Sequence, residues 1–383
     1  MALYAVSEPE GPAVKRVDSA RLIPSYEGHL AATADWLVRS IEQGKGGSCA
    51  YFSPLTGWSR PYPETTGYLI PTLIALSQFL NDFDGEGRAL ELGSWLLTLQ
   101  APDGWWHGGL HPPKGGVRPS VFNTAQILQG LIALHDLTDD ERWLESAARG
   151  ARWLAGGVAL DGLWAEKDYR SLGTPSYYTY AAWPMLEVAV RRGDETIRNA
   201  AEGVLGAILT RQRPNGAFSR WAFSEGEPAF THTIAYTLQG LIESAKLLGD
   251  WDTYGAPTQA ALTALVRIGE LENGRLPGRL DDDWVPAAGY VCLTGNAQTA
   301  LCLLDWEARQ RDPSLVRAAA ALIDAVCAAQ RLRVPLGALR GAVGGSAPIW
   351  GRYMVFRYPN WAAKYHCDAL MRLIGRLREE REP

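Results

Sequence analysis

The chain has 383 residues, a formal net charge of −5 and no block of Lys or Arg, which argues against a nucleic-acid-binding surface or a polybasic membrane patch. Its five cysteines are scattered without C-x-x-C spacing, so we expect no disulfide framework and a reducing, cytoplasmic location. We find no run of the roughly 18 apolar residues that a membrane span requires. The expected partner is therefore a small molecule or an oligosaccharide substrate. No oligomeric state is predicted.

One helical pattern recurs six times along the chain, with starts 55 to 66 residues apart. Each copy opens with polar or aromatic residues and then becomes apolar nearly all round, as a helix enclosed on every side does. We predict that these segments are inner helices. They are residues 64–76, 122–134, 177–190, 232–244, 294–304 and 360–371.

Six amphipathic segments alternate with the inner helices. Their apolar residues recur at helical spacing, with charged residues on the opposite face. They are residues 33–43, 89–100, 143–156, 195–212, 258–272 and 315–330. Alternating outer and inner helices predict an all-α (α/α)6 toroid that forms a single domain. We place an N-terminal arm at residues 1–30, the toroid at 31–376 and a charged tail at 377–383.

The connections differ in length, and the long ones indicate where a site lies. Links from inner to outer helices are short and charged, whereas several links from outer to inner helices have about twenty residues rich in Gly, Trp, Tyr and Pro. Long loops in a compact domain are usually functional. We expect them to gather on one rim around the starts of the inner helices, where converging helix N-termini favour anionic groups.

Five residues near this rim are candidates for catalysis. Glu64 begins an inner helix, whose N-terminus favours the ionised form of a base or nucleophile. His232 also begins an inner helix and titrates near neutrality. Tyr178 is an acid–base candidate, and Asp281 and Asp283 belong to an acidic run. Structural roles remain open for all five: helix start, satisfied core histidine, aromatic wall and solvated loop.

A second set of rim residues has the flat aromatic faces, amides and charges that hold sugars. The predicted substrate-binding residues are Tyr68, Trp106, Asn123, Tyr180, Tyr236, Arg279, Trp284, Asn296, Arg352, Asn360, Trp361 and Lys364. No organic cofactor and no metal site are expected. The spacing of Cys292, His366 and Cys367 matches no zinc family, and lone cysteines are usually buried.

One short phrase repeats after the outer helices. Gln100, Gly104 and Trp106 stand in Q-x-x-x-G-x-W spacing, and Gln212–Phe218 repeats it. This resembles the QW repeat of squalene–hopene cyclases and their prenyltransferase relatives, which are α/α toroids. The acidic D-x-D-D motif of the cyclases is absent, because Leu280 precedes the Asp run.

A fuller resemblance covers nearly the whole chain. The phrases "GWSRPYPETTGYLIPTL", "PSVFNTAQIL", "THTIAYTLQGL", "LPGRLDDDW", "CLTGNAQ" and "APIWGRYMVFRYPNWAAKY" resemble a poorly characterised bacterial toroid family. Its members are typically encoded in exopolysaccharide or surface-glycan gene clusters and are described as six-hairpin-glycosidase-like or prenyltransferase-like. The resemblance implies work on carbohydrates without naming a reaction.

Three functions follow as hypotheses. The first is a glycan-modifying enzyme. Hydrolysis would pair Glu64 with one carboxylate of the Asp281–Asp283 run, whereas epimerisation or elimination at a uronate would use His232, the tyrosines and Arg352. The second is an isoprenoid enzyme, cyclase-like or prenyl-transferring. The third is a non-catalytic glycan-binding protein.

Overall fold

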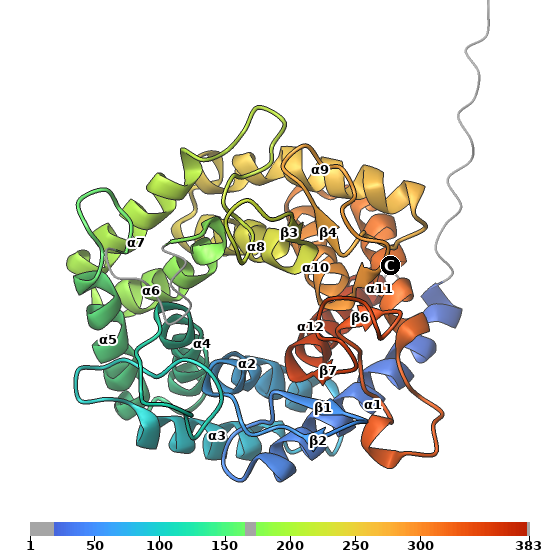
Figure 1. Ribbon diagram of the computed structural model, residues 1–383, viewed down its shortest axis with the longest axis horizontal. Helices are drawn as coiled ribbons and strands as arrows, with labels where there is room; N and C mark the ends of the chain where they lie inside the picture. Colours follow the sequence, from blue (N-terminus) through green and yellow to red (C-terminus); the bar gives the residue numbers. More distant parts are fainter. Residues whose placement is uncertain (1–18, 165–173, 381–383) are drawn as a thin grey trace, which may run out of the picture.

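The helices form a closed ring of two concentric layers. The computed structural model describes residues 19–164 and 174–380, and Figure 1 shows the ring viewed along its axis. The outer layer comprises α1 (Ser19–Gly44), α3 (Gly85–Leu99), α5 (Glu141–Gly156), α7 (Glu195–Leu209), α9 (Ala256–Leu271) and α11 (Pro313–Ala329). The inner layer comprises α2 (Pro63–Phe79), α4 (Val121–Thr138), α6 (Thr179–Arg192), α8 (Thr231–Leu248), α10 (Leu293–Gln310) and α12 (Asn360–Glu379). The predicted (α/α)6 toroid is confirmed.

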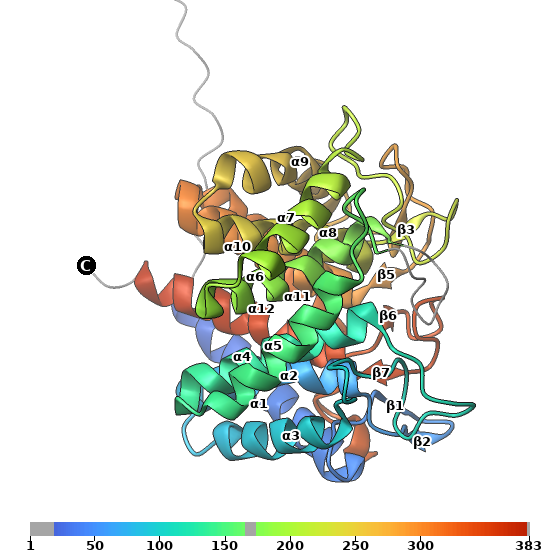
Figure 2. The same ribbon diagram turned by 90° about the vertical axis from the view of Figure 1, so that its left-hand side faces the viewer.

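Short strands mark the mouth of the ring at which the inner helices begin. They pair as β2 (Gly57–Trp58), β1 (Tyr51–Ser53) and β7 (Tyr358–Pro359) in one sheet, β3 (Ala229–Phe230) with β4 (Arg279–Leu280), and β5 (Val291–Cys292) with β6 (Ser346–Ala347). All the pairs are antiparallel. Because β3, β5 and β7 directly precede α8, α10 and α12, they lie at the N-terminal ends of these helices. Figure 2 shows the strands and long loops gathered at one end of the molecule.

A repeated glutamine ties one outer helix to the next around the ring at two places. The Gln100 amide donates to the carbonyls of Gly104 (2.8 Å) and Ser146 (2.9 Å), and Ser146 lies on α5. The Gln212 amide donates in the same way to Pro257 on α9. The QW-like motif therefore forms a joint between hairpins, that is, a hydrogen-bonded link from the end of one outer helix to the next outer helix. This is the role expected of a scaffold motif.

Glycines allow the inner helices to approach one another closely. A Cβ atom on Gly130 of α4 would lie 2.4 Å from the carbonyl oxygen of Gly67 on α2. A Cβ atom on Gly240 of α8 would lie 2.3 Å from the Thr179 backbone at the start of α6. Side chains at these positions would force the backbones apart, so glycine sets the interhelical distance.

Both ends of the toroid differ in detail from the expected boundaries. Residues 19–30, expected in the arm, form the first turns of α1, and α12 continues to Glu379. The rest of the arm and residues 381–383 of the tail lie outside the described residues. Two 3-10 turns, η1 (Ser176–Tyr178) and η3 (Gly337–Leu339), and a π turn, η2 (Trp251–Gly255), complete the elements. Among the described residues, no helix is both long enough and apolar enough to cross a membrane.

Candidate active site

A cavity of about 80 Å³ lies where the inner helices begin. We call it the central pocket. Most of its wall is aromatic, with one carboxylate, one imidazole and one amide. The lining residues are Tyr62, Glu64, Tyr68, Phe122, Asn123, Tyr177, Phe223, His232, Tyr236, Tyr353 and Trp361. Of the predicted site residues, the structure thus brings together Glu64, His232, Tyr68, Asn123, Tyr236 and Trp361.

His232 is held as a neutral imidazole of defined tautomer. Its Nδ1 lies 2.9 Å from Oε1 of Gln298, and the Gln298 amide donates to Oε1 of Gln239 at 2.7 Å. That second bond turns Oε1 of Gln298 toward His232, so Nδ1–H donates and Nε2 carries the lone pair. Burial lowers the pKa of His232 to about 3, despite the opposing hydrogen bond from Gln298. The imidazole is therefore uncharged at neutral pH, with an unprotonated Nε2, and its low pKa makes it a weak base unless a bound substrate raises that pKa.

Glu64 lies in the first turn of α2 and is 8% exposed. The Tyr62 hydroxyl donates a hydrogen bond to its Oε2. Burial first, and then neighbouring groups that include Glu64, raise the pKa values of Tyr68 and Tyr236 well above their ordinary value. Both phenols stay protonated and are suited to donate hydrogen bonds to a substrate oxygen, but not to act as bases.

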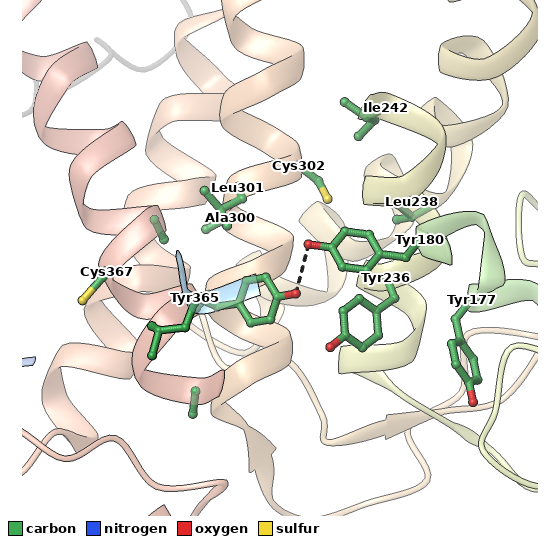
Figure 3. Close-up of a cluster of buried hydrophobic side chains, with 14 of the residues drawn as sticks. Tyr177, Tyr180, Tyr236, Leu238, Ile242, Ala300, Leu301, Cys302, Tyr365 and Cys367 are labelled. Atoms are coloured by element: carbon green, nitrogen blue, oxygen red, sulfur yellow. Dashed lines mark hydrogen bonds between the residues drawn. The ribbon is translucent and has the colours of Figure 1, made fainter. Parts of the chain in front are cut away.

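Tyrosines from opposite sides of the ring meet beside the pocket. The Tyr365 hydroxyl on α12 donates to the Tyr180 hydroxyl on α6 at 3.1 Å, as Figure 3 shows. The Tyr236 ring lies 4.7 Å from the Tyr180 ring and 4.2 Å from the His232 ring, between centroids. These contacts join α6, α8 and α12 near the axis of the ring. They also hold in place the tyrosine rings against which His232 packs.

The three asparagines predicted to bind substrate serve as anchors for rim loops. The amide of Asn123 donates to the carbonyl of His107 at 3.0 Å, and that of Asn296 to the carbonyl of Gly274 at 2.6 Å. The amide of Asn360 donates to the Ser48 hydroxyl at 3.0 Å. All three asparagines are fully or almost fully buried. Only Asn123 also lines the central pocket.

Trp106 and Tyr178 are packed into the protein rather than facing the central pocket. Trp106 is fully buried, and its indole N–H donates to the carbonyl of Leu96 at 2.8 Å. Tyr178 stacks on Phe122 with ring centroids 5.5 Å apart. The neighbouring Tyr177 lines the pocket instead, and its ring centroid lies 5.2 Å from that of Tyr178.

The acidic run lies outside the central pocket. The Asp281 carboxylate accepts from the backbone N–H groups of Asp283 (2.9 Å) and Val285 (2.8 Å), which closes a turn. Asp283 pairs with Arg213 at 3.1 Å. Together with Asp282, these acids line a separate hollow with residues 219–222 and 224–228. The structure therefore does not bring Asp281 or Asp283 together with Glu64.

The other predicted rim groups lie outside the described lining of the central pocket. Arg279 pairs with Glu227 at 3.0 Å, and the indole N–H of Trp284 donates to the Asn215 carbonyl at 3.0 Å. Arg352 is exposed. The described lining of the central pocket contains neither of these arginines and no lysine.

Lys364 is buried beneath the aromatic wall. Its ammonium pairs with Asp368 at 2.7 Å, one helical turn away, and lies 4.2 Å from the centroid of the Tyr365 ring. Its charge is thus neutralised within the ring, and its direct role is to hold the tyrosines in place.

Six residues that matter here were missed by the sequence analysis. Gln298 sets the tautomer of His232, and five aromatic residues line the pocket: Tyr62, Phe122, Tyr177, Phe223 and Tyr353. Three of them, Tyr62, Phe122 and Tyr177, lie next to the starts of inner helices. That position is the sequence signal that could have identified them as pocket residues. Phe223 and Tyr353 lie on long loops. A loop has no helical or strand periodicity from which the direction of a side chain could be predicted.

Comparison with solved structures shows which known proteins share this fold. No protein-family model and no curated protein matches the sequence. An unsaturated glucuronyl hydrolase specific for heparin superposes with a TM-score of 0.72 at 14% identity, over 92% of this chain and 98% of that one. Cellobiose 2-epimerase from Bacillus thermoamylovorans B4167 superposes with a TM-score of 0.75 at 10% identity, over 93% and 100%. The chain has the fold of these sugar enzymes.

A third solved structure supports the same conclusion. The sugar epimerase from a ruminal bacterium superposes with a TM-score of 0.74 at 12% identity, over 93% of this chain and 99% of that one. The expected six-hairpin-glycosidase-like toroid is thereby confirmed as a fold. At these identities the likeness establishes architecture, while chemistry must be argued from the residues of the pocket.

Proposed function

We propose that this protein is a carbohydrate-active enzyme that moves a proton on a sugar, as an epimerase does, in the central pocket. The observation that carries the proposal is the state of His232. Its ring is neutral, its Nδ1–H is committed to Gln298, and its Nε2 lone pair remains for a substrate proton. It is buried in an aromatic wall of the kind that packs on sugar rings.

The proposed reaction needs a base, a second proton-transferring group and donors for an oxygen. Epimerisation beside a carbonyl removes a proton from carbon, places negative charge on the carbonyl oxygen, and returns a proton to the opposite face. His232 takes the proton at Nε2, Glu64 in its carboxylic-acid form returns a proton to the opposite face, and both groups regain their starting protonation states by exchange with solvent. The protonated hydroxyls of Tyr68 and Tyr236 donate to the oxygen that becomes negative.

Charge in the pocket favours an uncharged sugar. The described lining has one carboxylate and no Lys or Arg, whereas a uronate carboxylate is ordinarily recognised by a cation. The solved neighbours named as a cellobiose 2-epimerase and a sugar epimerase support this choice. We include in the proposal that the enzyme acts on precursors of an exopolysaccharide, as the sequence resemblance implies, and that it is cytoplasmic, as the scattered cysteines suggest.

Hydrolysis is the second candidate because other solved neighbours are unsaturated glucuronyl hydrolases. A hydrolase that uses two carboxylates requires a partner for Glu64 across the scissile bond. Among the described lining residues, Glu64 is the carboxylate present, and the acidic run lies in another hollow. Epimerisation is therefore the better-supported reaction.

One experiment separates the candidates. The enzyme is incubated in D2O with cellobiose, with reducing monosaccharides and with an unsaturated glucuronyl disaccharide, and the products are followed by NMR. We expect deuterium to enter the carbon next to the carbonyl of a reducing sugar, together with the epimer. Cleavage without exchange at carbon would establish hydrolysis instead. Binding of the sugars without either change would mean that the protein is a glycan-binding module, and reaction with isoprenyl pyrophosphates alone would reject the proposal.

A further inference from the structure

Outside the central pocket, two histidines and a cysteine come together where the ring closes. His29 on α1, Cys327 on α11 and His366 on α12 place one ligand atom each within 4.8 Å of one another. The Nε2 atom of His366 lies 3.9 Å from Sγ of Cys327. Zinc bonded to sulfur at about 2.3 Å and to nitrogen at about 2.0–2.1 Å in tetrahedral geometry separates these atoms by about 3.6 Å. The separation of Cys327 and His366 is therefore close to that in a zinc site, and the cluster as a whole, with separations of up to 4.8 Å, is wider.

We propose that His29, Cys327 and His366 bind a zinc ion that ties the first helix of the ring to its last hairpin. Imidazole and thiolate are the ligands that zinc prefers over the hard cations. Three protein ligands leave a fourth position for water. The site differs from the zinc site considered from the sequence, since Cys292 belongs to a cluster with Phe230 and Tyr353 and His29 takes part.

The orientation of His29 fits this role. Nδ1 of His29 is hydrogen-bonded to Oε1 of Gln330. The Gln330 amide donates to the Thr33 hydroxyl (2.7 Å) and the Gly341 carbonyl (3.0 Å), so its oxygen faces His29. Nδ1–H of His29 is then the donor and Nε2 has the lone pair. Zinc-binding histidines are ordinarily held in this way by their second nitrogen.

Comparison with another joint of the ring shows that a histidine is not needed to hold Gln330. At the equivalent joint the Gln100 oxygen accepts from the hydroxyl of Ser146 at 2.7 Å. The Gln330 amide also donates to the His29 carbonyl, as the Gln100 amide does to that of Ser146. A serine thus makes the same contact at the corresponding position. The imidazole of His29 adds a ring nitrogen within 4.8 Å of the ligand atoms of Cys327 and His366.

His366 supplies an independent reason to expect a ligand. Its side chain is fully buried, and Nδ1 has no hydrogen-bond partner. Nε2 lies 3.9 Å from the Cys327 sulfur, a distance typical of a weak interaction. A buried polar nitrogen with only a weak partner costs free energy, and a metal bond would give Nε2 the strong partner that it lacks, whereas Nδ1 would stay without one. Binding follows the balance Cys–SH + Zn²⁺ → Cys–S–Zn⁺ + H⁺, with the proton released to solvent.

The test uses the full chain, stripped with a chelator and then titrated with zinc. We expect about one equivalent by atomic emission, a higher Tm, and release of a proton. Cobalt(II) in place of zinc should give a thiolate-to-cobalt charge-transfer band. His29→Ser replaces the imidazole with a hydroxyl that can donate to Gln330, as the Ser146 hydroxyl donates to Gln100, and it removes one metal ligand. It should therefore weaken zinc binding at least tenfold. Cys327→Ser should weaken zinc binding to the same extent. His135→Gln and Cys302→Ala change the same residue types elsewhere and should bind zinc like the wild type.

Two results would overturn the proposal. One is equal zinc affinity in the wild type and His29→Ser, and the other is a cobalt complex without the thiolate band. If circular dichroism shows that Cys327→Ser does not fold, the cobalt spectrum of the wild type and the zinc affinity of His29→Ser still test the proposal. Neither measurement depends on the reaction in the central pocket.

Discussion

The imidazole of His232 and the amide of Gln298 are joined across the neighbouring inner helices α8 and α10 by a hydrogen bond of 2.9 Å. Gln298 is held in turn by Gln239, which lies two turns after His232 on α8. The ring geometry of the proposed base is therefore set by the packing of two helices and not by the local sequence around His232.

Gln298→Glu should change the pH dependence of the reaction. A carboxylate at Nδ1 of His232 favours the imidazolium and raises its pKa by about 1–3 units. The neutral base is then lost at a higher pH, so the acidic limb of the kcat profile should move upward. Gln298→Ala removes the orientation without adding charge and should lower kcat about tenfold while leaving that limb nearly in place. Identical limbs in both variants would show that His232 does not titrate in the reaction.

His232 should also affect stability in acid. Its folded pKa is about 3 against an ordinary value of 6.5, so the unfolded chain binds more protons between these values. Stability contributed by this group is complete above pH 6.5 and falls as the pH drops, by up to about 1.4 kcal/mol per pH unit. In urea unfolding at pH 6 and pH 4, His232→Asn should lose about 2 kcal/mol less than the wild type. Parallel losses would contradict the buried neutral state.

Glu64→Gln and Asp281→Asn distinguish the two reaction types. Glu64 is the one carboxylate in the proposed proton transfer, where it acts together with His232, so Glu64→Gln should lower kcat by about 10²–10⁴. Asp281 closes a rim turn in a separate hollow, and its substitution should change kcat by less than about threefold. Comparable losses in both variants, measured on the substrate found in D2O, would instead support hydrolysis by two carboxylates.

Gly130→Ala should destabilise the ring while Gly206→Ala should not. The new Cβ on Gly130 would lie 2.4 Å from the Gly67 carbonyl oxygen, so α2 and α4 must separate. We expect a loss of about 2–4 kcal/mol, as for other overpacked contacts. Gly206 lies within α7 with open space at its Cβ position, where alanine should add about 0.5–1 kcal/mol. Urea unfolding of both variants checks the contrast; equal effects would show that the close approach is unimportant.

The sequence alone determined the architecture and the rim. Alternation of enclosed and amphipathic helical patterns is a local property of the chain, and it yielded the toroid, the inner helices and the mouth at which Glu64 and His232 lie. Helix starts were recognisable, so residues near them, such as Tyr68 and Tyr236, were also found. The Gln100 and Gln212 phrases were recognised as scaffold for the same reason.

Only the tertiary structure decided which rim residues share a pocket and which side chains meet across the ring. The sequence does not show that Asp281 turns into its own loop, that Asn296 and Asn360 hold loops, or that Gln298 orients His232. His29, Cys327 and His366 are separated by 298 and 39 residues along the chain, and they meet because the ring closes α1 onto α11 and α12. Contacts of this kind depend on distances between helices that are far apart in sequence, and no local pattern records those distances.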